Sequence, residues 1–252
     1  MNLLADLSAH PVIGHRGAAA YAPENTLESF RLALELGAEA LELDVRRSAD
    51  GEAMVFHDAT LERTTDGTGP LTAQTRAALA TLDAGYRFTD HQGRFPFRGT
   101  GLRIPTLREV IARFPWVPLM VELKEREVQG AVERVLIECD AADHVILAAD
   151  EWQALQAFRF EPFTLGASRR DITRLYFRLG RPDDRCRCYA VPDSFHGLPI
   201  PTRRFVQAAH ARQATVHVWT VDDARTAVRL WANGVNGIVT NRPDTIRAAR
   251  PA

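Results

Sequence analysis

Eight short apolar segments recur along the 252 residues, and most of them are followed by a helical pattern of apolar residues. Such alternation is typical of repeated βα units around a parallel sheet. A chain of this length also falls within the size at which an α/β barrel forms one domain. The number and order of the segments favour a closed barrel over an open sheet. The expected strands are Val12–Gly14, Ala40–Val45, Pro118–Leu123, His144–Ala148, Phe163–Gly166, Arg187–Val191, Thr215–Val221 and Gly237–Thr240.

Helical patterns fill most of the intervals between these strands. They cover Thr26–Leu36, Thr106–Phe114, Val128–Cys139, Trp152–Phe158, Thr202–Arg212 and Asp222–Trp231. The spacing breaks once, because about 60 residues separate the second strand from the helix at Thr106, and a structureless loop of that length is uncommon. We therefore expect one domain over residues 1–252 with an insertion at about residues 58–103. In this region we expect a short strand at Ala53–His57 that extends the second strand, a helix at Leu71–Leu82, and a lid or rim at Gly85–Gly101.

Carboxylates occupy alternate positions of two apolar strands. Side chains alternate between the two faces of a strand, so Glu42 and Asp44 share one face, and Glu122 and Lys124 share a face of another strand. A solvated strand face and a structural ion pair are the simpler interpretations of these two pairs. At the C-terminal ends of two barrel strands, however, the three carboxylates would form an oxygen-rich site for one divalent cation, Mg²⁺ or Ca²⁺. Lys124 would then be available to a phosphate oxygen.

Two histidines, His15 and His57, follow apolar segments in the first quarter of the chain. Each one alone would more often be a structural residue. Together they can share proton removal and proton donation at a phosphoryl group near neutral pH. Arg16, next to His15, offers a planar guanidinium to an anion. We expect the other histidines in structural or surface roles. His217 stands apart from them, because it lies in an apolar strand ahead of Trp219.

These residues lie within sequence blocks that resemble those of the glycerophosphodiester phosphodiesterase family. The blocks follow the family's order over almost the whole chain, and their combination is highly specific. They are His15-Arg16-Gly17, Pro23-Glu24-Asn25-Thr26, Glu42-Leu43-Asp44-Val45, His57-Asp58, Leu61 to Gly67, Ile104-Pro105-Thr106-Leu107, Glu122-Leu123-Lys124, Trp219-Thr220-Val221 and Gly234 to Pro243. The resemblance implies a (β/α)8 TIM barrel with a small insertion after the second strand, which is where the spacing breaks.

The resemblance also implies an activity, the metal-dependent hydrolysis of a small-molecule glycerophosphodiester to glycerol 3-phosphate and an alcohol. In the family mechanism, the glycerol 2-hydroxyl of the substrate attacks phosphorus. One histidine removes its proton and the other protonates the leaving alcohol. Water then opens the resulting cyclic phosphate with the two roles exchanged. Either histidine can act first.

The family pattern implies a role for each site residue at its position in this sequence. Glu24 and Asn25, in the loop after the first strand, would support the site. The pattern gives Trp219 a place in the pocket, and a position in the hydrophobic core is the alternative interpretation for this residue. The implied roles are catalysis by His15 and His57, cation binding by Glu42, Asp44 and Glu122, phosphate binding by Arg16 and Lys124, and coverage of the alcohol by Trp219.

One position departs from the family pattern. In the segment Thr240-Asn241-Arg242-Pro243, Asn241 stands where the family usually has aspartate. An amide can still cap a helix that begins at Arg242 or Pro243, so we expect a local consequence and a working site.

Two alternative functions remain compatible with the same residues. A lysophospholipase D-like enzyme would accept a phosphodiester that still carries an acyl chain, and aromatic residues of the insertion would form its apolar rim. Packing of the insertion onto the barrel is the simpler interpretation of these aromatics. A barrel that binds phosphodiesters without turnover is the other alternative, but it would not need both histidines and all three carboxylates. The aromatics are Tyr86, Phe88, Phe95 and Phe97.

The composition excludes several other classes of partner. The formal net charge is -1, with 31 basic and 32 acidic residues, which gives no reason to expect nucleic acid binding. No apolar run approaches the roughly 18 residues that a transmembrane helix requires. The first residues, which include Asp6, lack the basic and apolar stretches of a secretory signal, so we expect a cytoplasmic protein.

Overall fold

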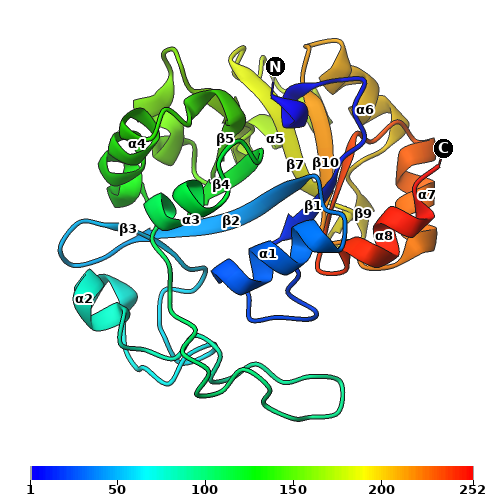
Figure 1. Ribbon diagram of the computed structural model, residues 1–252. Coiled ribbons are helices and arrows are strands. Elements are labelled where there is room, and N and C mark those ends of the chain that lie inside the picture. Colours follow the sequence, from blue (N-terminus) through cyan, green and yellow to red (C-terminus); the bar gives the residue numbers. More distant parts are fainter. Residues whose placement is uncertain (1, 252) are drawn as a thin grey trace.

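The computed structural model describes residues 2–251 and contains eight parallel strands that close into a barrel (Figure 1). Closure is complete because β1 pairs in parallel with both β2 and β11. Each predicted strand overlaps an observed one, and the predicted (β/α)8 barrel is confirmed. The barrel strands are β1 (Val12–His15), β2 (Ala40–Arg47), β4 (Leu119–Leu123), β5 (Val145–Ala148), β6 (Thr164–Gly166), β7 (Cys186–Pro192), β10 (Thr215–Trp219) and β11 (Gly237–Thr240).

Helices connect the strands around the outside of the barrel. They are α1 (Leu27–Glu35), α3 (Leu107–Arg113), α4 (Gln129–Glu138), α5 (Arg169–Phe177), α6 (Arg203–His210), α7 (Ala224–Ala232) and α8 (Pro243–Ala249). The helix predicted at Trp152–Phe158 is a 3-10 helix. The sequence patterns did not predict α5, which begins with a capping box between Ser168 and Asp171. Within residues 2–251, no helix has both the length and the apolar character needed to cross a membrane.

The barrel interior is closed by a small apolar cluster that includes Leu4 from a 3-10 helix at Leu3–Ala5. His217, fully buried on β10, donates from Nε2 to the Leu4 carbonyl oxygen over 2.8 Å. Thr215 donates to the same oxygen over 2.7 Å. Burial lowers the pKa of His217 to about 4, so this ring is neutral at pH 7. These contacts give His217 a structural role near the start of β10.

The insertion lies between the end of β2 and α3, beside β2 and β3 in Figure 1. β3 (Ala53–Val55) is antiparallel to β2 and pairs Val55 with Val45. The prediction that this segment extends the second strand is therefore wrong, because the chain reverses and forms a hairpin. The single helix predicted at Leu71–Leu82 is also wrong. Gln74 is extended there and separates a 3-10 helix (Leu71–Ala73) from the short α2 (Arg76–Leu79).

A second hairpin follows β7 and consists of β8 (Ser194–Phe195) and β9 (Leu198–Pro199). The sequence patterns did not predict it, because two-residue strands leave no periodicity. Its turn is formed by His196 and Gly197, whose φ angles are 48° and 79°. The hairpin places Phe195 and Leu198 at the surface, 56% and 51% exposed.

Candidate active site

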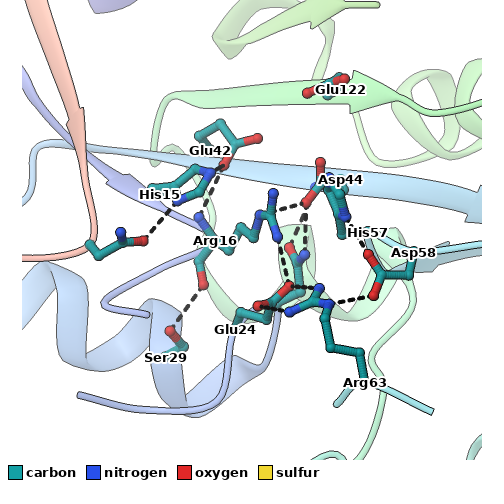
Figure 2. Close-up of polar contacts among 12 residues, drawn as sticks. His15, Arg16, Glu24, Ser29, Glu42, Asp44, His57, Asp58, Arg63 and Glu122 are labelled. Carbon is teal, nitrogen blue, oxygen red and sulfur yellow. Dashed lines mark hydrogen bonds and ion pairs between the residues drawn. The ribbon is translucent and has the colours of Figure 1, made fainter. Parts of the chain in front are cut away.

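Three carboxylates converge at the C-terminal ends of β2 and β4. These strands are parallel neighbours, and their register sets Asp44 opposite Glu122. Glu42 lies two residues before Asp44 on the same face of β2. One oxygen atom from each of the three residues lies within 4.8 Å of the others. Figure 2 shows the three side chains on their two strands. Glu42 and Asp44 are buried, whereas the Glu122 side chain is about one third exposed.

Two basic side chains face these carboxylates. Lys124 Nζ lies 3.2 Å from Asp44 Oδ1 and 2.8 Å from Glu122 Oε1, and Arg16 Nε lies 3.1 Å from Asp44 Oδ2. Burial opposes the ionisation of Asp44, yet the charges of Lys124 and Arg16 hold its pKa below the ordinary value. Burial, followed by the negative charges of Asp44 and Glu122, raises the pKa of Glu42 well above the ordinary value. The site therefore concentrates more negative charge than these two cations compensate.

The three carboxylates fit a hard divalent cation. They offer only oxygen atoms, which are the ligands that Mg²⁺ and Ca²⁺ prefer. Asp44 Oδ1 is buried, and its ion pair with Lys124 leaves it able to bind a cation as well. A cation would also neutralise the charge that raises the pKa of Glu42. Glu42, Asp44 and Glu122 are therefore a coherent candidate set of ligands.

The loop after β1 orients two of these carboxylates. Arg16 and Asn25 are both left-handed, with φ angles of 51° and 58°, a conformation that costs a non-glycine residue roughly 1–3 kcal/mol. Gly17 has a φ of 91°, and a Cβ atom there would lie only 2.5 Å from the α1 backbone. The loop geometry lets Asn25 Nδ2 donate to Asp44 Oδ2 over 2.9 Å, and the Arg16 amide donate to Glu42 Oε2 over 3.0 Å.

His15 is held from one side by Asn241. Its Nδ1 lies 2.8 Å from Asn241 Oδ1, and its Nε2 lies 4.0 Å from Glu42 Oε2. Asn241 Nδ2 donates to Asp222 Oδ2 over 2.7 Å, so the amide oxygen must face His15. The neutral ring therefore carries its proton on Nδ1 and a lone pair on Nε2. Burial, followed by the charge of Arg16, lowers the pKa of His15.

The predicted capping role of Asn241 is wrong. α8 begins at Pro243, its N-cap residue is Arg242, and no side chain forms a capping hydrogen bond there. Pro243 occupies the first helical position, where its missing amide hydrogen removes no helical hydrogen bond. Asn241 instead connects Asp222 to His15. The departure from the family's aspartate therefore changes the charge directly beside His15.

His57 is held by a carboxylate. Its Nδ1 lies 2.6 Å from Asp58 Oδ1, and Asp58 also forms an ion pair with Arg63. Burial opposes the ionisation of Asp58, but hydrogen bonds from Arg63 and His57 lower its pKa to about 2. Glu24 connects these contacts to Arg16. Its carboxylate lies 2.7 Å from the Arg63 guanidinium and 2.8 Å from that of Arg16. Figure 2 shows this chain of charged contacts.

One pocket of about 660 Å³ unites these groups at the mouth of the barrel. Trp219 lines its wall with 42% of the residue exposed, outside the core. His196, predicted as a structural or surface residue, also lines the pocket. The lining residues further include His15, Arg16, Glu42, His57, Glu122 and Lys124.

The aromatic residues of the insertion are not among the lining residues of this pocket. Phe88 packs edge-on against Phe97, with ring centroids 5.3 Å apart. The guanidinium of Arg98 lies 4.4 Å from the ring centre of Tyr86 and 3.6 Å from that of Phe95. The apolar rim expected of a lysophospholipase D-like enzyme is therefore not formed by this segment.

Comparison with known proteins identifies the family. The model of the glycerophosphoryl diester phosphodiesterase family matches residues 15–245. The chain belongs to this family. YhdW of Bacillus subtilis strain 168 is 33% identical over 243 residues, which are 93% of this chain and 96% of that protein. A glycerophosphodiester phosphodiesterase of Caldanaerobacter subterraneus subsp. tengcongensis is 30% identical over 256 residues, 93% of this chain and 95% of that protein.

Solved structures of glycerophosphodiester phosphodiesterases share the fold. The enzyme from Agrobacterium tumefaciens superposes with a TM-score of 0.78 at 26% identity, covering 96% of this chain and 100% of that one. An Oleispira antarctica phosphodiesterase, in complex with the product sn-glycerol-3-phosphate, superposes with a TM-score of 0.76 at 27% identity and 96% coverage of both chains. The resemblance stated from the sequence blocks is confirmed, and the chain is a phosphodiester hydrolase by family.

In this family member, sequence patterns identified the side chains that converge on the pocket and the supporting residues Glu24 and Asn25, but they assigned no role to Asp58, Arg63 or Asp222. Asp58 follows His57 directly, so its role had a local signal. Asp222 had no local signal, because it acts through Asn241, which lies 226 residues from His15 in the sequence.

Proposed function

We propose that this protein hydrolyses glycerophosphodiesters to glycerol 3-phosphate and an alcohol. The observation that carries the proposal is the convergence of two histidines, two carboxylates and two basic side chains on one pocket, with the buried Asp44 completing the carboxylate cluster behind it. An acid, a base and phosphate-binding cations around one cavity are the groups that phosphodiester cleavage requires. The product bound in the Oleispira antarctica phosphodiesterase supports this choice of substrate.

The two histidines would exchange protons through Nε2, because another side chain already binds Nδ1 in each ring. Burial and Arg16 favour the neutral form of His15, which suits it to accept the proton of the attacking hydroxyl. The Asp58 carboxylate accepts from Nδ1 of His57 and orients the ring so that Nε2 is free, which suits that ring to pass a proton to the leaving alcohol. We therefore assign the first proton removal to His15.

Arg16 and Lys124 would stabilise the phosphoryl oxygens. Both side chains line the pocket and both contact Asp44, which keeps them charged and oriented beside the carboxylates. Glu42, Asp44 and Glu122 would hold one divalent cation, Mg²⁺ or Ca²⁺. When bound, such a cation supplies positive charge that polarises a phosphoryl oxygen and lowers the pKa of a nearby hydroxyl. Trp219 would cover the alcohol portion of the substrate from the opposite strand, β10.

Substitution of each histidine tests the proposal. His15→Ala and His57→Ala should each lower the release of glycerol 3-phosphate from glycerophosphocholine by ~10²- to 10⁴-fold while the fold survives. His91→Ala, at an exposed position of the insertion, is the matched control and should retain the wild-type rate. Near-normal turnover in either active-site variant would refute the assignment. Ligand binding without any turnover by the wild type would indicate a binding protein instead.

A further inference from the structure

A hairpin brings the backbone of His57 back to the strand that carries the carboxylates. β3 lies antiparallel beside the end of β2 and finishes at Val55, which is paired with Val45 (Figure 1). The next amide, that of Phe56, donates to the backbone oxygen of Asp44 over 2.9 Å. His57 follows the last of these backbone contacts, so the position of its backbone depends on side chains.

Arg46 provides such a side chain. It lies two residues beyond Asp44 and four beyond Glu42 on β2, so alternation places it on the strand face of both carboxylates. Its Nε donates to the backbone oxygen of His57 over 2.8 Å. The guanidinium is planar, so this contact also sets the direction of its other donors. The strand that carries two candidate cation ligands therefore also holds the backbone of His57.

Glu125, directly after β4, holds Arg46 in turn. Its Oε2 accepts from Arg46 Nη1 and its Oε1 accepts from the Arg47 amide, each over 2.8 Å. Glu125 is the N-cap residue of the 3-10 helix Arg126–Val128, yet its side chain forms no capping hydrogen bond and contacts β2 instead. The Arg46 and Glu125 side chains are only 14% and 16% exposed. Solvent therefore screens this ion pair less than a surface pair.

His57 is thus held at two points. Arg46 holds its backbone oxygen, and Asp58 Oδ1 lies 2.6 Å from its ring Nδ1. His57 lines the pocket, whereas Arg46 and Glu125 are not among the lining residues. An effect of this ion pair on the reaction would therefore pass through His57 and not through direct contact with the substrate.

We infer that Arg46 and Glu125 are positioning residues that keep His57 within reach of the leaving alcohol. The inference rests on the proposed function, in which His57 passes a proton to that alcohol. A displacement of about 1 Å in a catalytic group can cost ~100-fold in rate. Choline needs this proton to leave, whereas p-nitrophenolate leaves as a stable anion without one. Loss of the ion pair should therefore slow the release of choline selectively.

Two substrates with different leaving groups test the inference. Glycerophosphocholine and the p-nitrophenyl ester of glycerol 3-phosphate are each mixed with an excess of purified protein and Mg²⁺ or Ca²⁺, and the single-turnover rates of choline and p-nitrophenol release are measured. Arg46→Met keeps the length of the side chain but loses its donors. We expect its rate to fall by ~10- to 100-fold for choline and by less than about threefold for p-nitrophenol. His57→Ala should show the same selectivity with a larger loss.

A second variant removes the partner of the arginine. Glu125→Ala should also slow choline release selectively, and the double variant should lose no more than Arg46→Met alone, because both residues act through one contact. The ratio of the two rates does not depend on the fraction of folded protein, so it separates positioning from a loss of stability. Arg76→Met removes an exposed ion pair with Glu109 and is the control that should keep both rates at the wild-type value.

The outcomes separate the inference from the proposed function. Equal losses on both substrates in Arg46→Met or Glu125→Ala would overturn the positioning role. Wild-type rates of choline release in these variants would overturn it as well. In either case, release of choline by the wild type would still uphold the proposed function. A wild type that releases neither choline nor p-nitrophenol would overturn both.

Discussion

Replacement of Asn241 by leucine should lower kcat and leave KM nearly unchanged. Leucine has a similar size but cannot accept the Nδ1–H of His15, whose side chain is only 16% exposed. An unsatisfied donor in such a place costs about 1–3 kcal/mol, which corresponds to a loss of about 5- to 150-fold in kcat if the ring must regain its orientation in each turnover. Asn241 is not a lining residue of the pocket, so substrate binding should be spared.

Asn241→Asp should retain most of the activity, because a carboxylate still accepts from His15 Nδ1. Its negative charge would raise the pKa of His15, so the acidic limb of the activity profile should move to higher pH. Steady-state kinetics on glycerophosphocholine across pH 5–9 measures both effects. Asn233→Leu, at the end of α7 where Asn233 contacts Arg203, is the control. A wild-type kcat in Asn241→Leu would refute the positioning role.

Three further predictions concern stability and the cation. His217 has a pKa of about 4 in the folded state, below its unfolded value of 6.5. Its contribution is therefore complete above pH 6.5 and declines as the pH falls. In urea titrations, wild type should lose about 3 kcal/mol more than His217→Gln between pH 7 and pH 4, and equal losses would contradict this. Gly17→Ala should lower the free energy of unfolding by about 1–3 kcal/mol, because φ is 91° there and a Cβ would collide with α1. Mg²⁺ or Ca²⁺ should raise the Tm of metal-stripped protein, with about 2.7 kcal/mol of stabilisation at a hundredfold excess over Kd. Glu42→Gln should abolish most of that rise, and an unchanged rise would remove Glu42 from the ligand set.

Strand positions could be predicted from sequence because each barrel strand is a short apolar segment that is recognisable without the rest of the chain. Glu42 and Asp44 share a face through alternation alone, and the parallel pairing of β2 with β4 then brings Glu122 beside them. The positions of His15 and His57 followed from the strands before them. The helical spacing of apolar residues likewise predicted most of the outer helices.

The missed features depend on contacts between distant parts of the chain. Asn241 resembled a helix cap in its local sequence, but tertiary structure sets it between Asp222 and His15. The β8–β9 hairpin is too short to leave a pattern, and only the folded structure shows that its exposed Phe195 and Leu198 line the pocket. The aromatics of the insertion had a suitable composition for an apolar rim, yet they pack against one another and Arg98.

The central claim is that the cluster of histidines and carboxylates cleaves a glycerophosphodiester. Phosphorus NMR of glycerophosphocholine incubated with metal-stripped protein tests it directly. After addition of Mg²⁺ or Ca²⁺, we expect the diester signal to be replaced by that of glycerol 3-phosphate in the wild type and to persist in His15→Ala. A diester signal that persists in the wild type with either cation would contradict the claim.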